Sequence, residues 1–489
     1  MDYNAEDGDK GILFDASKEN DYGSTDAANS FNGSLSSGEY TFEEAVEHFG
    51  FGKFQIRLGI SVGLTLVADA AQLLAPAVLG SVLECSSWHL SKVEVAWLTT
   101  IVFLGMIAFS SAVGWIIDKF GRKKGILVTL TAGAVFAALG AVAPSYPYLL
   151  ASRFFVGAAL AGSLQVFGYI EEFLPVGHRR RAMLTQLFWP LGGLWASGFG
   201  LLMIHYLKLS WQWYLVVLSV PLFLTVLFVV LLPESARFLG ALGKFDKVHK
   251  ILTKIGKENG TGLPRGNLST VSLCSYSESD KPAPKAAFAE LFSGQNLKTT
   301  LFLAILWFAS GFCYYGMVLL VTTFDSKDKT SKSNCIPLEL GDYYDLIWTG
   351  FAEIPGTIIV FYALEKFGRK KSLIVQFIIA GASFIPFYFR MPYGVYLASL
   401  LIGRATAQGI ISALVIYTPE VYPTFLRGKG IGLANMFFRT GGMATPFFSQ
   451  VTVHNYFDLT ISFYAGFCFL AAICAFLLPK ETQGLELED

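Results

Sequence analysis

Charged residues are scarce in this 489-residue sequence: they make up 15% of it, against roughly 25% in soluble domains. Hydrophobic residues reach 53%, a balance that excludes the disordered, collagenous and disulfide-scaffold classes. Six cysteines are too few for a disulfide framework, and no Cys or His group has the spacing of metal ligands. No basic domain of high charge density is present, so we expect no nucleic-acid partner.

Patterns for catalysis and nucleotide binding are also missing. The sequence contains no nucleophile–base pair and no P-loop of the form G-x-x-x-x-G-K-[ST], which would indicate an ATP-driven pump. The N-terminus lacks a basic segment followed by an apolar core, so we expect no signal peptide. An enzyme is therefore disfavoured, and we expect neither a cofactor nor a bound metal.

Long apolar runs are what the sequence does contain. A membrane helix needs roughly 20 mostly apolar residues to cross ~30 Å of hydrocarbon, and twelve stretches meet this need. We therefore predict an all-α membrane protein with twelve transmembrane helices. The spans lie near 58–81, 93–117, 125–143, 147–170, 183–206, 212–232, 299–323, 344–364, 372–389, 394–416, 430–452 and 457–478.

The spans divide the chain into five parts. Residues 1–50 hold 12 acidic and two basic side chains, and we expect an acidic, disordered tail there. A six-helix bundle (51–232), a linker (233–298), a second six-helix bundle (299–478) and a short tail (479–489) follow. Around 245–257 the linker has an apolar and a basic helical face. This pattern fits either a helix lying on the inner leaflet or a helix packed on neighbouring loops.

Loop charges predict the orientation. The short loops on the side of the N-terminus hold 13 Lys and Arg residues, against about six on the other side. Because positively charged loops stay in the cytosol, we expect both termini to be cytosolic, in a plasma membrane or an intracellular vesicle membrane. Cys85 and Cys335 then lie on the outer side, where the oxidising environment permits a disulfide. They either pair or remain free.

Two loop motifs recur at one offset and in the same order. Residues 118–124 and 365–371 are identical at six of seven positions, 247 residues apart. The pattern Glu-x-x-Pro-x-x-x-Arg occurs at 172–179 and again, 248 residues later, at 420–427. An internal duplication of six spans explains both repeats. Parallel halves of this kind place a binding site near the midplane between them.

The charged residues of these loops are a candidate cytosolic gate. Gly121 and Gly368 permit the tight reversal that so short a connection needs. Ion pairs among these loops would hold the two halves together while the path is closed to the cytosol, and opening would break them. The alternative is that the charges only set topology. The gate candidates are Gly114, Asp118, Gly121, Arg122, Glu172, Arg179, Glu365, Gly368, Arg369, Glu420 and Arg427.

These motifs carry a family resemblance. Gly114-x-x-x-Asp118-x-x-Gly121-Arg122 resembles the signature loop of the major facilitator superfamily, and Arg153-Phe-Phe-Val-Gly157 resembles its fourth-span motif. The segment Tyr417-Thr-Pro-Glu420-Val-Tyr-Pro423 resembles the corresponding segment of the synaptic vesicle two-related proteins and of the plant organic cation/carnitine and nicotinate transporters. The resemblance implies the major facilitator fold and transport by alternating access. It also implies a path lined by spans one, four, seven and ten, and a protein that functions as a monomer.

Ionisable residues inside spans are costly and are functional candidates by default. Asp69 is the best candidate for a proton or cation site. Glu353 precedes Pro355-Gly356, where we expect a broken helix, and Arg439 could be its partner in a buried pair. Arg404 and Arg153 occupy similar places in the two halves and could be structural, bonded to backbone carbonyls. The near-midplane candidates are Asp69, Glu353, Arg404 and Arg439.

The substrate is less well defined. Tyr314 and Tyr315 in span seven and Gln165 in span four are further candidates for substrate contact. Where relatives of the named branch carry two membrane carboxylates, this chain has Gln72 and Ala196. Their loss slightly favours an organic anion, such as a small aromatic carboxylate, with a proton as candidate coupling ion. The alternatives are an organic cation or carnitine-like substrate, and a non-transporting sensor or vesicle protein that retains the fold.

Overall fold

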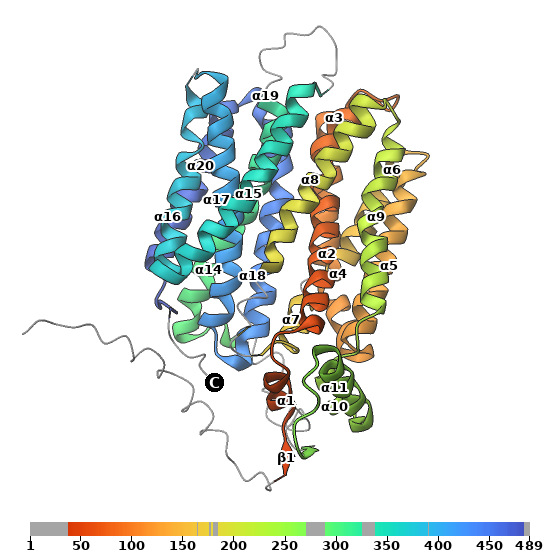
Figure 1. The fold of residues 1–489 in the computed structure, drawn as a ribbon. Helices are drawn as coiled ribbons and strands as arrows, with labels where there is room; N and C mark the ends of the chain where they lie inside the picture. Colours follow the sequence, from red (N-terminus) through yellow and green to blue (C-terminus); the bar gives the residue numbers. More distant parts are fainter. Residues whose placement is uncertain are drawn as a thin grey trace, which may run out of the picture.

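The computed structural model describes residues 38–163, 165–175, 178, 184–269, 289–324, 338–389 and 391–483. Two helical bundles stand side by side with their long helices along a common direction (Figure 1). The earlier half of the sequence forms the bundle on the right, and the later half forms the bundle on the left. In the described residues, β1 (Glu39–Tyr40) also pairs in parallel with β2 (Asn267–Leu268).

Each bundle follows the predicted order of six spans. The first consists of α2 (Lys53–Leu74), α3 (Pro76–Glu84), α4 (Lys92–Phe120), α5 (Arg122–Ala141), α6 (Tyr146–Leu160), α7 (Gln165–Glu171), α8 (Phe188–Gly200), η2 (Leu201–Tyr206) and α9 (Trp211–Val230). The second consists of α14 (Gly294–Phe324), α15 (Leu340–Phe367), α16 (Arg369–Ala382), η5 (Ile385–Tyr388), α17 (Tyr393–Val421), α18 (Thr424–Pro446), η6 (Phe447–Thr452), α19 (Val453–Asn455) and α20 (Phe457–Leu477).

Eleven helices of the described chain are long and apolar enough to cross a membrane. The remaining predicted span, the eleventh (430–452), falls on α18 and η6, where Asn435, Arg439 and several Gly and Thr residues lower the mean hydropathy. α18 packs along α14 and α4, so protein rather than lipid surrounds much of it. It completes the twelve-helix fold although its own sequence is only moderately apolar.

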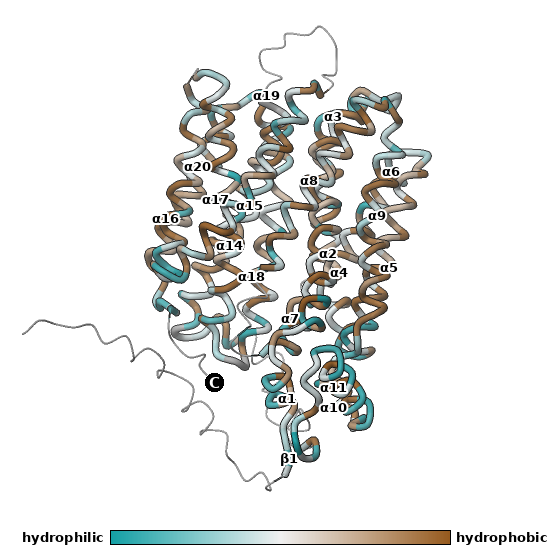
Figure 2. Tube along the Cα trace, in the orientation of Figure 1, coloured by the Kyte–Doolittle hydropathy of each residue, from teal (hydrophilic) through white to brown (hydrophobic). Residues whose placement is uncertain are grey.

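The outer surface of the bundles is apolar. Large side chains such as Trp115, Leu227, Ile359 and Phe476 are exposed. Apolar residues follow the long helices, and hydrophilic residues gather at the helix ends and in the segment around α10 and α11 (Figure 2). Exposed apolar surface of this extent is stable when hydrocarbon, rather than water, surrounds the helices.

The two bundles meet at mid-depth and toward one end. α8 packs on α15, and α4 packs on α18 and η6. The Thr100 hydroxyl donates to the Met443 carbonyl at 3.1 Å, and the Trp97 ring meets the Phe447 ring edge-on at 5.6 Å. We call the other end, which carries the loops 118–124 and 365–371, the basic end.

One predicted helix break was wrong, and another break is present. α15 runs through Pro355 as a single helix. Span four instead divides into α6, which ends at Leu160, and α7, which begins at Gln165, whereas its repeat partner α17 is one continuous helix. Backbone carbonyls freed by such a break inside a membrane must find partners in the protein. The duplicated halves therefore differ at mid-depth.

The predicted disordered tail, residues 1–50, is partly folded, so that boundary was wrong. Residues 1–37 lie outside the described part, but α1 (Phe42–Phe49) is a helix that begins at a Thr41–Glu44 capping box. Its apolar face is buried, and the Phe42 ring packs edge-on against Phe173 at 6.3 Å. The helix was not predicted because the acidic composition of residues 1–50 obscured the helical spacing of the apolar residues within 42–49.

The linker helix packs on protein. After α10 (Ala236–Ala241), the amphipathic helix α11 (Phe245–Asn259) buries Val248, Leu252 and Ile255. It contacts α10, α1 and α2, and its lysines are exposed. Of the two predicted alternatives, the packed helix is the one that the structure has, because the apolar face is covered by protein and is not available to a leaflet.

Cys85 lies at the end opposite the basic loops, just after α3, and is disulfide-bonded. Cys335 lies outside the described residues, so its pairing with Cys85 stays a prediction. Cys313, Cys468 and Cys474 are buried free thiols within spans, as expected of small packing residues.

Asn259 joins α11 to the first bundle. Its side chain accepts from the Phe54 N–H at 3.0 Å and donates to Gln55 Oε1 at 2.8 Å and to the Phe49 carbonyl at 3.3 Å. Asn259→Ala should therefore loosen α11, since leaving one side of such a bond unpaired costs about 1–3 kcal/mol. Chymotryptic cleavage of the linker in the detergent-solubilised full-length protein should become several-fold faster.

Lys257→Ala is the matched control for this measurement. Lys257 lies on the same helix, is exposed, and should leave the cleavage rate at the wild-type value. An unchanged rate for Asn259→Ala would show that α11 docks without this side chain.

Candidate functional site between the bundles

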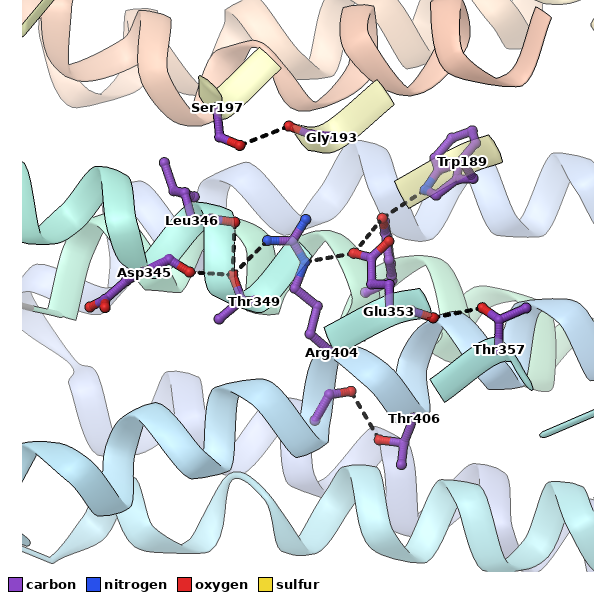
Figure 3. Close-up of polar contacts among 12 residues, drawn as sticks. Trp189, Gly193, Ser197, Asp345, Leu346, Thr349, Glu353, Thr357, Arg404 and Thr406 are labelled. Atoms are coloured by element: carbon purple, nitrogen blue, oxygen red, sulfur yellow. Dashed lines mark hydrogen bonds and ion pairs between the residues drawn. The ribbon is translucent and has the colours of Figure 1, made fainter. Parts of the chain in front are cut away.

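A buried ion pair lies inside the second bundle. Arg404 on α17 donates through Nε to Glu353 Oε1 on α15 at 2.7 Å, and both side chains are almost fully buried. Arg404 Nη1 also donates to Thr349 Oγ1 at 2.9 Å (Figure 3). The predicted pairing of Glu353 with Arg439 was therefore wrong, because α17 lies directly against α15 and brings Arg404 to the carboxylate.

A hydrogen-bond chain links this pair to the first bundle. The Tyr314 hydroxyl on α14 donates to Glu353 Oε1 at 3.1 Å. Trp189 Nε1 on α8 donates to the same hydroxyl at 2.7 Å (Figure 3). The chain crosses from one bundle to the other through neutral groups and ends on a carboxylate. A shift of one bundle against the other must stretch or break it.

Two atoms of the pair lack protein partners. Glu353 Oε2 is buried and has no hydrogen bond within the described part of the chain. Arg404 Nη2 has none there either; a Cβ added at Gly193 of α8 would lie 3.7 Å from it. In Figure 3 the guanidinium lies between α15 and the α8 segment that carries Gly193 and Ser197.

A small pocket, with a cavity volume of about 10 Å³, lies beside Arg404 between the bundles. Its walls come from α2, α3 and α8 on one side and from α14, α15 and α17 on the other. Arg404 is the charged group in the lining, and Ser197, whose hydroxyl donates to the Gly193 carbonyl at 2.9 Å, is the hydroxyl group. The lining residues are Leu74, Ala77, Val78, Gly193, Ala196, Ser197, Val318, Leu346 and Arg404.

A second charged cluster joins the bundles at mid-depth. Asp69 on α2 lies in electrostatic range of Arg439 on α18 and within hydrogen-bonding reach of Ser163, and its Oδ1 has no bond among the described residues. Arg439 crosses to the first bundle, where its Nη1 donates to the Met106 carbonyl at 3.0 Å and its Nη2 approaches the Ala161 carbonyl at 3.5 Å. The break in span four thus supplies an acceptor to Arg439.

Arg153 is buried without a carboxylate partner in the described chain. Its Nη1 and Nη2 donate to Gln72 Oε1 and to the Gln72 carbonyl, at 2.8 and 2.7 Å. Gln72 in turn donates to the Leu218 carbonyl at 2.8 Å. The backbone-bonded interpretation fits Arg153 in part, but for Arg404 it was wrong. Gly157, one turn further along α6, packs against α4, where a Cβ would lie 2.0 Å from the Val102 carbonyl oxygen.

The remaining predicted substrate contacts differ in burial. Tyr315 is buried against Phe103 of the first bundle, with ring centroids 4.8 Å apart, and its hydroxyl has no partner among the described residues. Gln165 starts α7 and is exposed. It is not in the pocket lining, so the structure does not bring Gln165 to the other candidates.

The basic end of the first bundle carries a charge network. Arg122 forms an ion pair with the buried Glu172 and donates to the Gly168 carbonyl at 3.0 Å. Glu172 also accepts from Ser235 at 2.6 Å. Burial raises the pKa of Glu172, and the opposing effects of Arg122 and Ser235 reduce that rise. Glu234 accepts from the Lys123 N–H at 2.8 Å.

The second bundle repeats this network. Arg369 holds Glu420 through two bonds of 3.1 and 2.9 Å. Thr482 donates to Glu420 at 2.5 Å, and Glu481 accepts from the Arg369 and Lys370 N–H groups at 2.8 and 3.1 Å. Glu481 and Thr482 correspond to Glu234 and Ser235 at the same offset of 247. Sequence analysis did not identify the roles of these four residues, although Pro233-Glu-Ser follows the sixth span and Pro479-Lys-Glu-Thr follows the twelfth.

The predicted gate needs a correction. The ion pairs Arg122–Glu172 and Arg369–Glu420 each lie within one bundle, so they do not hold the two halves together. Gly121 and Gly368 have φ of +103° and +89°, which favours glycine, at the turn beside each network.

The other gate candidates lie around these networks. Asp118 and Glu365 are exposed, and Gly114 is half-buried on α4. Arg179 lies outside the described residues. Arg427 is partly buried near the start of α18, and the partner of Glu420 is Arg369 rather than Arg427. Contact of Asp118 or Glu365 with the opposite half stays a prediction for an arrangement with a closed basic end.

Comparisons with known proteins agree with this architecture. The family model described as sugar (and other) transporter matches residues 27–489. The synaptic vesicle 2-related protein of Xenopus laevis is 36% identical over 464 residues, covering 92% of this chain and 82% of that protein. Organic cation/carnitine transporter 7 of Arabidopsis thaliana is 29% identical, covering 92% and 96%.

A solved structure shows the same fold. The partially occluded, inward open form of the xylose transporter XylE from E. coli superposes with a TM-score of 0.66 at 17% identity, covering 89% of this chain and 99% of that one. The family model spans nearly the whole sequence, and the twelve helices have the arrangement that the repeated loops predicted. The chain therefore belongs to the sugar (and other) transporter family of the major facilitator superfamily, a family of multi-pass membrane transporters rather than enzymes.

Proposed function

We propose that this protein is a secondary transporter that moves a small organic anion across a membrane by alternating access. The observation that carries the proposal is the pocket between the bundles, which Arg404 lines and where its Nη2 has no hydrogen-bond acceptor among the described residues. A site lined by both bundles can be exposed to either side as the bundles rock.

The balance of buried charge supports an anion. Glu84 and Asp342 are buried near the ends of α3 and α15. Deeper inside the described spans, the buried cations are Arg153, Arg404 and Arg439, and the buried carboxylates are Asp69 and Glu353. Glu353 is bonded to Arg404 and Asp69 faces Arg439, so neither carboxylate is left unneutralised for a cationic substrate. Arg153 adds a further positive charge. An organic cation, named for one of the relatives, fits this balance less well.

The networks at the basic end give each bundle stiffness. In each bundle, one network joins the loop after the second span to the end of the fourth span and to the segment after the sixth. Bundles stiffened in this way move as units, which alternating access requires. The 13 basic residues counted in the short loops on the side of the N-terminus support a cytosolic position for this end and for both termini, by the positive-inside rule. The vesicle-related names of the relatives favour a vesicle membrane.

Uptake into liposomes tests the proposal. The purified full-length protein should show saturable uptake of at least one labelled organic anion, several-fold above protein-free liposomes. The panel should hold aliphatic and aromatic carboxylates, organic cations and carnitine. Saturable uptake of cations alone would overturn the anion assignment. No uptake of any compound, with ligand binding intact, would favour the alternative of a sensor that retains the fold.

Arg122→Ala should slow uptake more than it lowers the amount of folded protein. The change leaves Glu172 buried beside Ser235 without its cation, and an unpaired buried charge is costly. The double variant Arg122→Ala with Glu172→Gln removes that charge and should recover part of the rate. The measurement is initial uptake per folded transporter, counted by size-exclusion chromatography.

Lys124→Ala is the matched control in this series. Lys124 belongs to the same loop and is exposed, so uptake should stay at the wild-type rate. If Arg122→Ala also transports at that rate, the stiffness of the first bundle does not depend on this network.

A further inference from the structure

We propose that Glu353 is the proton-coupling carboxylate of the transport cycle, and that its protonation releases Arg404 to bind the carboxylate of a small aliphatic acid in the pocket. The inference rests on the proposed function, and it names both the coupling residue and the substrate class of that site. Sequence alone favoured Asp69 for the proton and an aromatic acid for the substrate.

The geometry assigns separate tasks to the two oxygens of Glu353. Oε1 accepts from Arg404 at 2.7 Å and from Tyr314 at 3.1 Å. Oε2 is buried with no hydrogen bond among the described residues. A proton can therefore add to Oε2 without displacing an existing donor. The resulting neutral acid no longer balances the charge of Arg404, which then needs another anion.

Arg404 is placed to receive that anion. It lines the pocket, and its Nη1 and Nε are held by Thr349 and Glu353 while Nη2 has no bond to the described protein. A carboxylate in the pocket can accept from Nη2. It can also accept from the Ser197 hydroxyl of the opposite bundle once that hydroxyl turns away from the Gly193 carbonyl. Binding would then draw the two bundles together around the substrate.

Asp69 is less well placed for this task. It faces Arg439 and Ser163 and does not line the pocket. A proton on Asp69 would change the charge beside Arg439, which is bonded to the backbone of the first bundle. A proton on Asp69 would therefore alter the contact of Arg439 with the first bundle, and it would leave Arg404, the proposed substrate-binding cation, unchanged.

The surroundings of Glu353 hold few other charges. The charged or titratable groups that face it are Arg404 on α17 and Tyr314 and Tyr315 on α14. The element packed on it from the first bundle, α8, contributes the indole of Trp189, which bonds Tyr314. Arg404 is therefore the cation that faces Glu353, and an anion that binds Arg404 weakens its hold on a negative charge at Glu353, which favours the protonated acid. Proton and anion binding at this site strengthen each other.

The lining selects an aliphatic acid. Leu74, Val78, Val318 and Leu346 form apolar walls, with small residues of α8 between them. No aromatic side chain is among the described residues that line the pocket, and Trp189 and Tyr314 are occupied by their mutual bond. A short carboxylate of a few carbons matches the chemistry of this lining, with the aliphatic part on the walls and the carboxylate at Arg404. The cavity of about 10 Å³ must widen as the bundles rock before it holds such an acid.

The charges balance in such a cycle. One proton adds to Glu353 as one monocarboxylate anion binds Arg404, and both leave on the other side. No net charge crosses the membrane with the loaded carrier. Transport should therefore respond to a pH gradient and be insensitive to an imposed membrane potential.

The test compares wild-type and Glu353→Gln full-length protein in liposomes, with labelled lactate as probe and protein-free liposomes subtracted. Wild-type uptake should rise several-fold with an inward proton gradient and stay unchanged when a potassium diffusion potential is imposed. In Glu353→Gln the gradient should have no effect, while exchange of external for internal lactate continues. Full gradient stimulation in Glu353→Gln would overturn the proposal.

Binding provides a second readout if Glu353→Gln does not transport. Lactate affinity of the detergent-solubilised wild type should tighten as pH falls, approaching about tenfold per pH unit when one proton accompanies each anion. In Glu353→Gln the affinity should not change with pH. Asp69→Asn should keep the wild-type pH dependence, even at a lower transport rate. Asp69→Asn losing that dependence while Glu353→Gln keeps it would return the coupling role to Asp69.

Uptake of a panel of substrates distinguishes failure of the proposed substrate class from failure of the proposed function. Wild-type uptake of aromatic acids but not of C3–C5 aliphatic acids would overturn the substrate class while leaving anion transport in place. Uptake of no anion at all would overturn the proposed function itself. Asp458→Asn, a change at an exposed residue at the start of α20, is the matched control for removal of a carboxylate.

Discussion

Hydrocarbon offers no hydrogen bonds, and this absence governs the interior of the protein. Every polar group inside the spans must find its partner within the chain, since an unsatisfied group costs several kcal/mol. The arginines show the consequence: Arg404 takes Glu353 and Thr349, Arg153 takes Gln72, and Arg439 reaches across to the Met106 carbonyl. Among the buried polar atoms of the described chain that lack a partner, Glu353 Oε2 and Asp69 Oδ1 belong to carboxyl groups inside the spans, and these two are the most informative because a buried carboxylate is the costliest group to leave unpaired.

The two duplicated halves remain similar at the basic end and differ at mid-depth. At the basic end the two networks match residue by residue, from Arg122 and Arg369 to Glu234 and Glu481. At mid-depth the halves differ: span four is broken while span ten is continuous, and Arg153 meets an amide where Arg404 meets a carboxylate. A frame that moves as two equal bodies benefits from symmetry, whereas a site for one asymmetric substrate does not.

Sequence predicted the fold because hydropathy and repetition are read along the chain. It also marked Glu353, Arg404, Asp69 and Arg439, since charge inside an apolar run is conspicuous. It did not predict that Glu353 pairs with Arg404, because partners depend on which faces of α15 and α17 meet. The fold of α1 was missed because composition over 50 residues concealed one apolar helical face. α18 was predicted as a span, and its burial against α14 and α4 explains why a less apolar sequence is tolerated there.

A buried ion pair is not by itself a source of stability, because desolvation offsets much of the attraction. The Glu353–Arg404 pair is therefore better explained by what it permits. Its two members lie on neighbouring helices of one bundle, while Tyr314 and Trp189 connect it to the other. A change in the charge of the pair therefore alters the hydrogen bond between Trp189 and Tyr314, which joins the two bundles. In the proposed cycle, substrate binding and the movement of the bundles are therefore coupled at the Tyr314 hydroxyl, which lies 3.1 Å from the carboxylate and 2.7 Å from the indole nitrogen.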